Sequence, residues 1–91
     1  MKEKHFLISG RVQGVGFRHF TTVKARNLGL KGWVKNLPDG RVEAVIQGDP
    51  GNIYKMAEIL RQGPPSAKVR DIESGQLKNP GKIHDTFFVK R

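Results

Sequence analysis

Residues 10–18 of the chain are Gly10-Arg11-Val12-Gln13-Gly14-Val15-Gly16-Phe17-Arg18. A strand-like segment precedes this stretch and a helix-like segment follows it, which predicts a glycine-rich turn between a strand and a helix. Glycine adopts positive φ angles without strain, and its missing Cβ lets a ligand approach the backbone. Successive N–H groups in such a turn, with a helix N-terminus behind them, can bind an anion. Arg18 would add a guanidinium suited to phosphate or carboxylate oxygens.

The same stretch, taken alone, also fits a tight connection that binds nothing. It is not the phosphate-binding loop of nucleoside triphosphatases, because no Gly-Lys-Ser or Gly-Lys-Thr follows the glycines. It is not a dinucleotide-binding loop either. The third glycine of that pattern is missing, and no acidic residue stands about 20 positions further on.

The composition describes one small domain, which we expect to span residues 1–91. No stretch approaches the roughly 20 apolar residues of a membrane span, so we expect no membrane association. The chain has no cysteine, which excludes disulfides and thiolate metal sites, and no secretory segment is recognisable. We therefore expect a cytoplasmic monomer. Its net charge of +9 favours anionic partners.

Hydrophobic periodicity and turn signals divide the chain into alternating elements. We predict strands at 5–12, 30–36, 42–46 and 68–73, helices at 18–28 and from Asp49 to before Gly63, and an additional short strand at 86–90. The order is that of an α+β, ferredoxin-like βαββαβ sandwich, a mostly antiparallel sheet with two helices on one face. Residues 74–85 are predicted to form a loop. Such folds host many unrelated functions, so the order alone assigns none.

The second predicted helix has the clearest local signals. Asp49 is a typical N-cap and Pro50 suits the first helical position. An apolar stripe follows at helical spacing, made of Ile53, Met56, Ala57 and Leu60. The segment 63–65, Gly-Pro-Pro, stops the helix.

A second conspicuous motif is Gly32-Trp33-Val34-Lys35-Asn36, which ends the second strand before a Leu-Pro-Asp-Gly turn. Asparagine often ends strands because its side chain bonds its own backbone. If the first strand and this hairpin share one sheet, however, Asn36 can lie beside the glycine-rich turn. An anion bound there would lie between Arg18 and an amide able to orient a water molecule.

These two motifs together resemble those of the acylphosphatase family. The first is matched from Gly10 to Arg18, and the second from Gly32 to Asn36, with further matches at Gly40, Val42, Gly48 and the 63–65 segment. The resemblance covers roughly residues 6–69. Residues 75–86 carry no family signature, and we assign no role to His19.

The resemblance implies a small ferredoxin-like enzyme that hydrolyses the carboxyl–phosphate bond of acyl phosphates without metal or organic cofactor. It implies that Arg18 binds the phosphate and that Asn36 positions the attacking water. Backbone N–H groups of the turn would help to bind the phosphate, which makes the predicted phosphate-binding set Gln13, Gly14, Val15, Gly16, Phe17 and Arg18. The partner is then a small-molecule acyl phosphate, and phosphate or sulfate can occupy the same place.

Other functions are open at this point. The element order and charge also suit a nucleic-acid-binding module, but the 31–35 segment lacks the aromatic residues that an RNA-recognition motif carries next, so we do not expect nucleic acid. An inactive, anion-binding accessory domain would have the same fold. The histidines His5, His19 and His84 lack metal-ligand spacing, and no serine lies in a nucleophile elbow.

Overall fold

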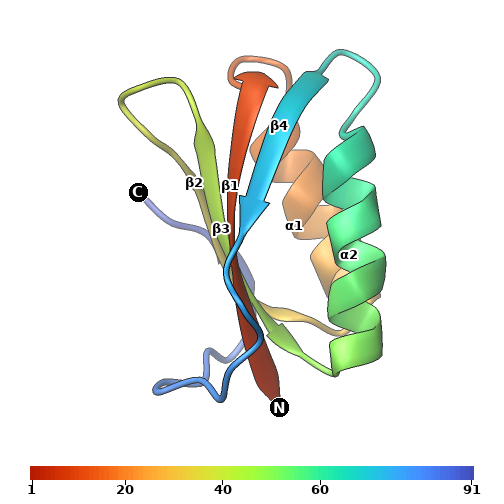
Figure 1. Ribbon diagram of the computed structural model, residues 1–91, viewed down its shortest axis with the longest axis vertical. Coiled ribbons are helices and arrows are strands. Elements are labelled where there is room, and N and C mark those ends of the chain that lie inside the picture. The colour runs from red at the N-terminus through yellow and green to blue at the C-terminus, as the bar shows by residue number, and fades with distance from the viewer.

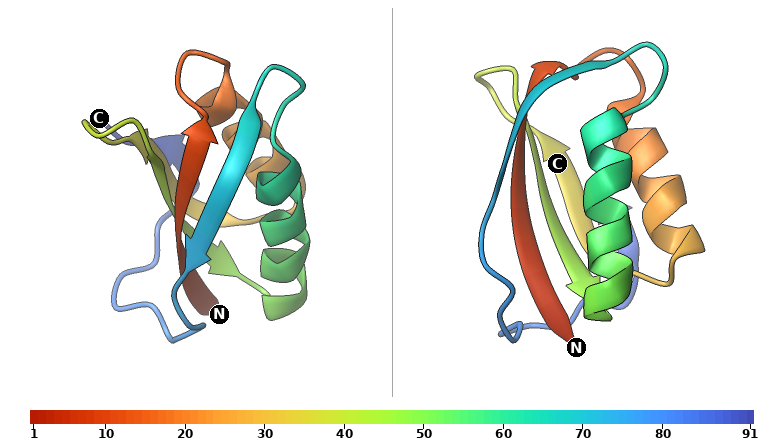
Figure 2. Two further views of the ribbon diagram at one scale, coloured as in Figure 1. Left: turned by 45° about the horizontal axis from the view of Figure 1, so that its top comes forward. Right: turned by 45° about the vertical axis from the view of Figure 1, so that its right-hand side comes forward.

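The computed structural model describes residues 1–91, which form two helices and five strands. In chain order these are β1 (Lys2–Arg11), α1 (Phe17–Asn27), β2 (Lys31–Asn36), β3 (Val42–Gly48), α2 (Pro50–Gln62), β4 (Lys68–Ser74) and β5 (Phe87–Val89). The strands make one sheet in the order β4-β1-β3-β2-β5, and both helices cover the same face of it (Figures 1 and 2). The predicted ferredoxin-like sandwich is confirmed.

Strand direction determines which loops meet. β1 pairs antiparallel with β3 and β4, β2 pairs antiparallel with β3, and β2 pairs parallel with β5. It follows that β1, β2 and β5 run in the same direction. Their C-terminal ends therefore lie together along one side of the sheet, here called the C-terminal edge. It lies at the top of Figure 1, where the glycine-rich turn leaves β1 and the hairpin joins β2 to β3.

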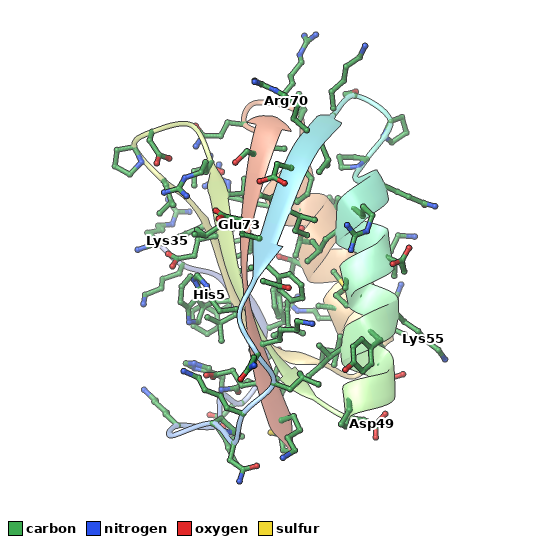
Figure 3. The ribbon with its side chains drawn as sticks, viewed as in Figure 1. His5, Lys35, Asp49, Lys55, Arg70 and Glu73 are labelled. Atoms are coloured by element: carbon green, nitrogen blue, oxygen red, sulfur yellow. The ribbon has the colours of Figure 1, made fainter.

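The core lies between the sheet and the helices. Helix α2 contributes its predicted apolar stripe to this core. The four residues of the stripe are buried as expected: Ile53, Met56, Ala57 and Leu60. The predicted N-cap is also confirmed, because the Asp49 carboxylate at the start of α2 accepts hydrogen bonds from the next two free N–H groups, at 3.0 and 3.3 Å (Figure 3). Burying such a stripe is the main source of stability for a helix this short.

Several predicted boundaries differ from the structure. β1 begins at Lys2 rather than at residue 5, because β3 extends to Gly48 and supplies backbone partners for the charged residues that open β1. α1 begins one residue early, at Phe17, and β5 is limited to Phe87–Val89. Neither helix is long and apolar enough to cross a membrane.

The segment from residue 75 to 86 is largely irregular. It leads from β4 to β5 at the end of the sheet opposite the C-terminal edge, which is the lower end in Figure 1. It is attached there by the fully buried side chain of Gln47. The Gln47 amide donates to the Glu3 carboxylate and the Lys82 carbonyl, at 2.9 and 2.6 Å, and accepts from the His84 N–H. These bonds satisfy a buried amide and fix the path that leads into β5.

Candidate active site

A cavity of about 360 Å³ opens at the C-terminal edge of the sheet. This volume is within the usual range for small-molecule sites. Its walls come from the turn after β1, the first turns of α1, the end of β2 and the residues at and beyond the end of β5. The lining residues are Val12, Gly14, Gly16, Phe17, Arg18, His19, Thr22, Asn36, Val89 and Arg91.

The turn between β1 and α1 presents unused hydrogen-bond donors. The N–H groups of residues 13–19 have no backbone or side-chain acceptor within the protein, and no side chain caps α1. Gly14 and Gly16 have left-handed φ angles of 73° and 79°, and a Cβ built on either would meet no atom within 4 Å. Free donors next to open space at a helix N-terminus are the arrangement that binds phosphate through the backbone.

Arg18 brings the positive side chain of this turn. It is exposed, and its guanidinium forms no ion pair and no hydrogen bond with the protein. None of the ten lining residues is acidic, whereas Arg18 and Arg91 are both cationic. The cavity therefore attracts anions, and the guanidinium is available to bind one.

Asn36 enters the same cavity from the end of β2. Its backbone pairs with Val42 of β3, which fixes its position at the C-terminal edge. Its side-chain Oδ1 is buried and has no hydrogen-bond partner in the protein. A buried acceptor without a partner is costly, and few native proteins keep one without a functional reason. Oδ1 is therefore suited to accept a hydrogen bond from a bound water or substrate group.

The structure brings most of the predicted site residues together. Gly14, Gly16, Phe17, Arg18 and Asn36 all line the cavity. Two predicted residues of the turn do not. The Val15 side chain packs against the core, and the Gln13 amide donates to backbone carbonyls of the β2–β3 hairpin. Their N–H groups remain among the free donors of the turn.

Five lining residues were not predicted as site residues from the sequence, and one of them, Val12, is a buried core residue directly after β1. His19 and Thr22 follow Arg18 on the first turns of α1, while Val89 and Arg91 come from the C-terminal end of the chain. The helical spacing could have predicted His19 and Thr22, because both lie close to Arg18 on the surface of α1. No local signal marks the second pair, because they reach the cavity only through the parallel pairing of β5 with β2.

No group of three His, Asp or Glu side chains is placed to bind a metal ion.

One carboxyl near the site has a shifted pKa. A hydrogen bond from the Arg41 N–H, supported by the Arg41 guanidinium, lowers the pKa of Asp39 in the turn that follows Asn36. Asp39 is therefore an anion that holds the turn, and it does not line the cavity.

Comparison with known proteins agrees with this geometry. The family model described as Acylphosphatase matches residues 4–89. The chain belongs to the acylphosphatase family. Its activity class follows from that membership: it is a hydrolase that acts on acyl phosphates.

Individual acylphosphatases match over the full chain. An acylphosphatase from Methanocella arvoryzae is 50% identical over 90 residues, which cover 99% of this chain and 100% of the relative. The crystal structure of acylphosphatase from Bacillus subtilis superimposes with a TM-score of 0.95 at 36% identity and full coverage of both chains. The crystal structure of T. kodakarensis HypF also matches, with a TM-score of 0.85 at 36% identity, but over only 12% of that chain.

The acylphosphatase family match does not favour the nucleic-acid-binding alternative. The open face of the sheet carries the one tryptophan of the chain. Trp33 on β2 is its largest aromatic residue, and Lys90 lies over the ring, 4.4 Å from the centroid. Nearby, the Glu43 carboxylate accepts a 2.7 Å hydrogen bond from His5 and lies 3.9 Å from Lys35. Both basic side chains lie on the side of the sheet opposite the helices (Figure 3). Lys90 therefore occupies one face of the Trp33 ring in a cation–π contact.

Proposed function

We propose that residues 1–91 act as a single acylphosphatase domain whose catalytic centre is the cavity at the C-terminal edge. The observation that carries the proposal is the meeting of two opposite kinds of unused hydrogen-bonding group. The turn of residues 13–19 supplies donors without acceptors, and Asn36 supplies a buried acceptor without a donor. A phosphoryl group with an adjacent water molecule needs both.

In the proposed mechanism, the phosphoryl oxygens of the substrate bind to the free N–H groups of residues 13–18 and to the Arg18 guanidinium. These donors need no reorganisation as charge develops on the oxygens during the reaction. Inorganic phosphate or sulfate would bind in the same place. Arg18 is expected to contribute about 1.5–3 kcal/mol for each charge-assisted hydrogen bond.

Asn36 acts on the nucleophile. Its Oδ1 accepts a hydrogen bond from a water molecule and directs the water oxygen at phosphorus, opposite the acyl oxygen. The new O–P bond forms as the P–O bond to the acyl group breaks, and the electron pair leaves with the carboxylate. A carboxylate whose acid has a pKa near 4 leaves without protonation, so no general acid is needed. The water proton passes to an oxygen of the substrate's own phosphate.

The test is hydrolysis of benzoyl phosphate in the presence of EDTA, with wild type, Arg18→Ala and Asn36→Ala assayed together. We expect metal-independent turnover by the wild type. Arg18→Ala should lower kcat/KM at least tenfold and weaken inhibition by inorganic phosphate. Asn36→Ala should lower kcat by a similar or larger factor and leave phosphate inhibition nearly unchanged. A folded wild-type protein without turnover would refute the proposal.

A monomeric state and a cytoplasmic location complete the proposal, and both rest on composition. Light scattering across a tenfold range of protein concentration tests the first, and fractionation of the source cells tests the second. A concentration-dependent mass would exclude the monomer.

A further inference from the structure

The two halves of the cavity come from strands that are not neighbours. β3 lies between β1 and β2 in the sheet, so the turn after β1 and Asn36 at the end of β2 are separated by two strand spacings, or about 10 Å. The relative position of the donors and of Asn36 Oδ1 therefore depends on how the turn is held against the β2–β3 hairpin.

The sheet ladder does not provide that support. The last paired residues of β1 and β3 are Ile8 and Val42, and β1 then continues beside β4 through a bulge at Ser9 and Gly10. Beyond this point no backbone hydrogen bond joins the turn at residues 12–16 to the hairpin at residues 36–41. The two segments diverge just where the catalytic groups begin.

One side chain bridges this opening. The Gln13 Nε2 group donates to the Leu37 carbonyl at 2.8 Å and to the Arg41 carbonyl at 2.9 Å, which uses both of its hydrogens. Carbonyl oxygens only accept, so the amide nitrogen must be the atom that faces them. These are the only side-chain hydrogen bonds between the turn and the hairpin.

The acceptors belong to a turn that is already rigid. The Arg41 carbonyl also accepts from the Leu37 N–H at 2.8 Å, and the Leu37 carbonyl accepts from the Gly40 N–H at 3.1 Å. Asp39 braces the same turn through two hydrogen bonds from Arg41. Gln13 is thus fixed to the residue that directly follows Asn36.

We infer that Gln13 is a positioning residue, whose side chain sets the distance between the phosphate-binding turn and the water held by Asn36. This inference rests on the proposed function and adds a role that the lining of the cavity does not reveal. The Gln13 side chain contacts neither substrate nor water, because its amide is used by the hairpin. Its loss leaves the N–H groups of the turn and Arg18 in place but allows the turn and the hairpin to move relative to each other. Phosphate binding then persists while the alignment of water and phosphorus is lost.

The experiment compares wild type with Gln13→Met, which keeps the length of the side chain but has no donor, and with Gln13→Asn, which is too short to reach the hairpin. The matched control is Gln62→Met, at an exposed glutamine that ends α2. We expect both Gln13 variants to lower kcat for benzoyl phosphate by roughly tenfold to hundredfold, since misplacement by about 1 Å has an effect of that size. The inhibition constant of inorganic phosphate should change less than about threefold.

A second readout follows the same variants by amide NMR during titration with inorganic phosphate. The backbone signals of Gly14 and Gly16 should shift in every protein, whereas the response of the Asn36 side chain should weaken in the Gln13 variants only. A parallel loss of kcat and phosphate affinity would overturn the inference, because Gln13 would then support the turn itself. Unchanged kcat, or failure of both variants to fold, would also overturn it. A wild type without turnover would refute the proposed function, and the inference with it.

Discussion

Replacing Asn36 by leucine should stabilise the protein and abolish its activity. Asn36 Oδ1 is buried without a partner, and such a group destabilises a folded protein by about 1–3 kcal/mol. Leucine has the same branching and the same number of side-chain heavy atoms, carries no polar atom and is better suited to a strand such as β2. We therefore expect the free energy of unfolding to rise by about 1–2 kcal/mol. Each kcal/mol corresponds to an increase in Tm of about 4–8 °C for a domain of this size.

The measurement is urea unfolding followed by the fluorescence of Trp33, the single tryptophan of the chain. The buffer must contain no phosphate or sulfate, because an anion bound to the folded wild type would add stability that the variant lacks. Asn79→Leu is the control, since Asn79 is exposed in the irregular segment before β5 and should change the stability by less than about 0.5 kcal/mol. Benzoyl phosphate turnover is measured on the same samples.

Two results would refute this reasoning. If Asn36→Leu were less stable than wild type, the Asn36 amide would be hydrogen-bonded within the folded protein in solution, and Oδ1 would not be an unused acceptor. If the variant were more stable and still hydrolysed benzoyl phosphate, the water would be oriented by another group.

Three further predictions concern the turn, the hairpin and the overall charge. Gly16→Ala should lower the free energy of unfolding by about 1–2 kcal/mol, because Gly16 has a left-handed φ of 79°, while Gly81→Ala, at a glycine without a positive φ, should change it little in the same urea assay. The pKa of Asp39 is lowered from its ordinary value of 3.8, so its carboxylate stabilises the fold above that pH and loses its effect as the pH falls. At neutral pH the wild type should therefore have a higher Tm than Asp39→Asn. This difference in Tm should shrink and then disappear as the pH falls below 3.8. The net charge of +9 should make kcat/KM, but not kcat, fall several-fold between about 0.01 and 0.15 M salt, and an insensitive kcat/KM would exclude steering.

Local signals in the sequence were sufficient to predict most of the fold. The Asp49 cap, the apolar stripe of α2 and the turn before Val42 each act within a few residues, so their patterns predict structure directly. The early start of β1 at Lys2 was not predictable in this way. Its first residues are charged, and they form a strand only because β3 offers backbone partners far away in the sequence.

The candidate site was predicted in part for the same reason. Arg18 and Asn36 belong to motifs, and the structure places both at one cavity, while their catalytic roles remain to be tested. Val89 and Arg91 line the cavity because β5 lies parallel to β2, which is a property of the whole sheet. The side-chain contacts of Gln13 were missed because a glycine-rich pattern indicates how the backbone turns, not where a neighbouring side chain points.

The common direction of β1, β2 and β5 divides the molecule into two ends with different tolerance for change. The cavity occupies one end, whereas the first residue and the irregular segment before β5 lie at the other (Figure 1). An affinity tag, a fluorescent domain or a surface tether attached to residue 1 would therefore extend away from the cavity. The same addition after Arg91 would crowd its mouth, since Arg91 is part of the lining. For immobilised or fused forms of the enzyme, the N-terminal end is the appropriate point of attachment.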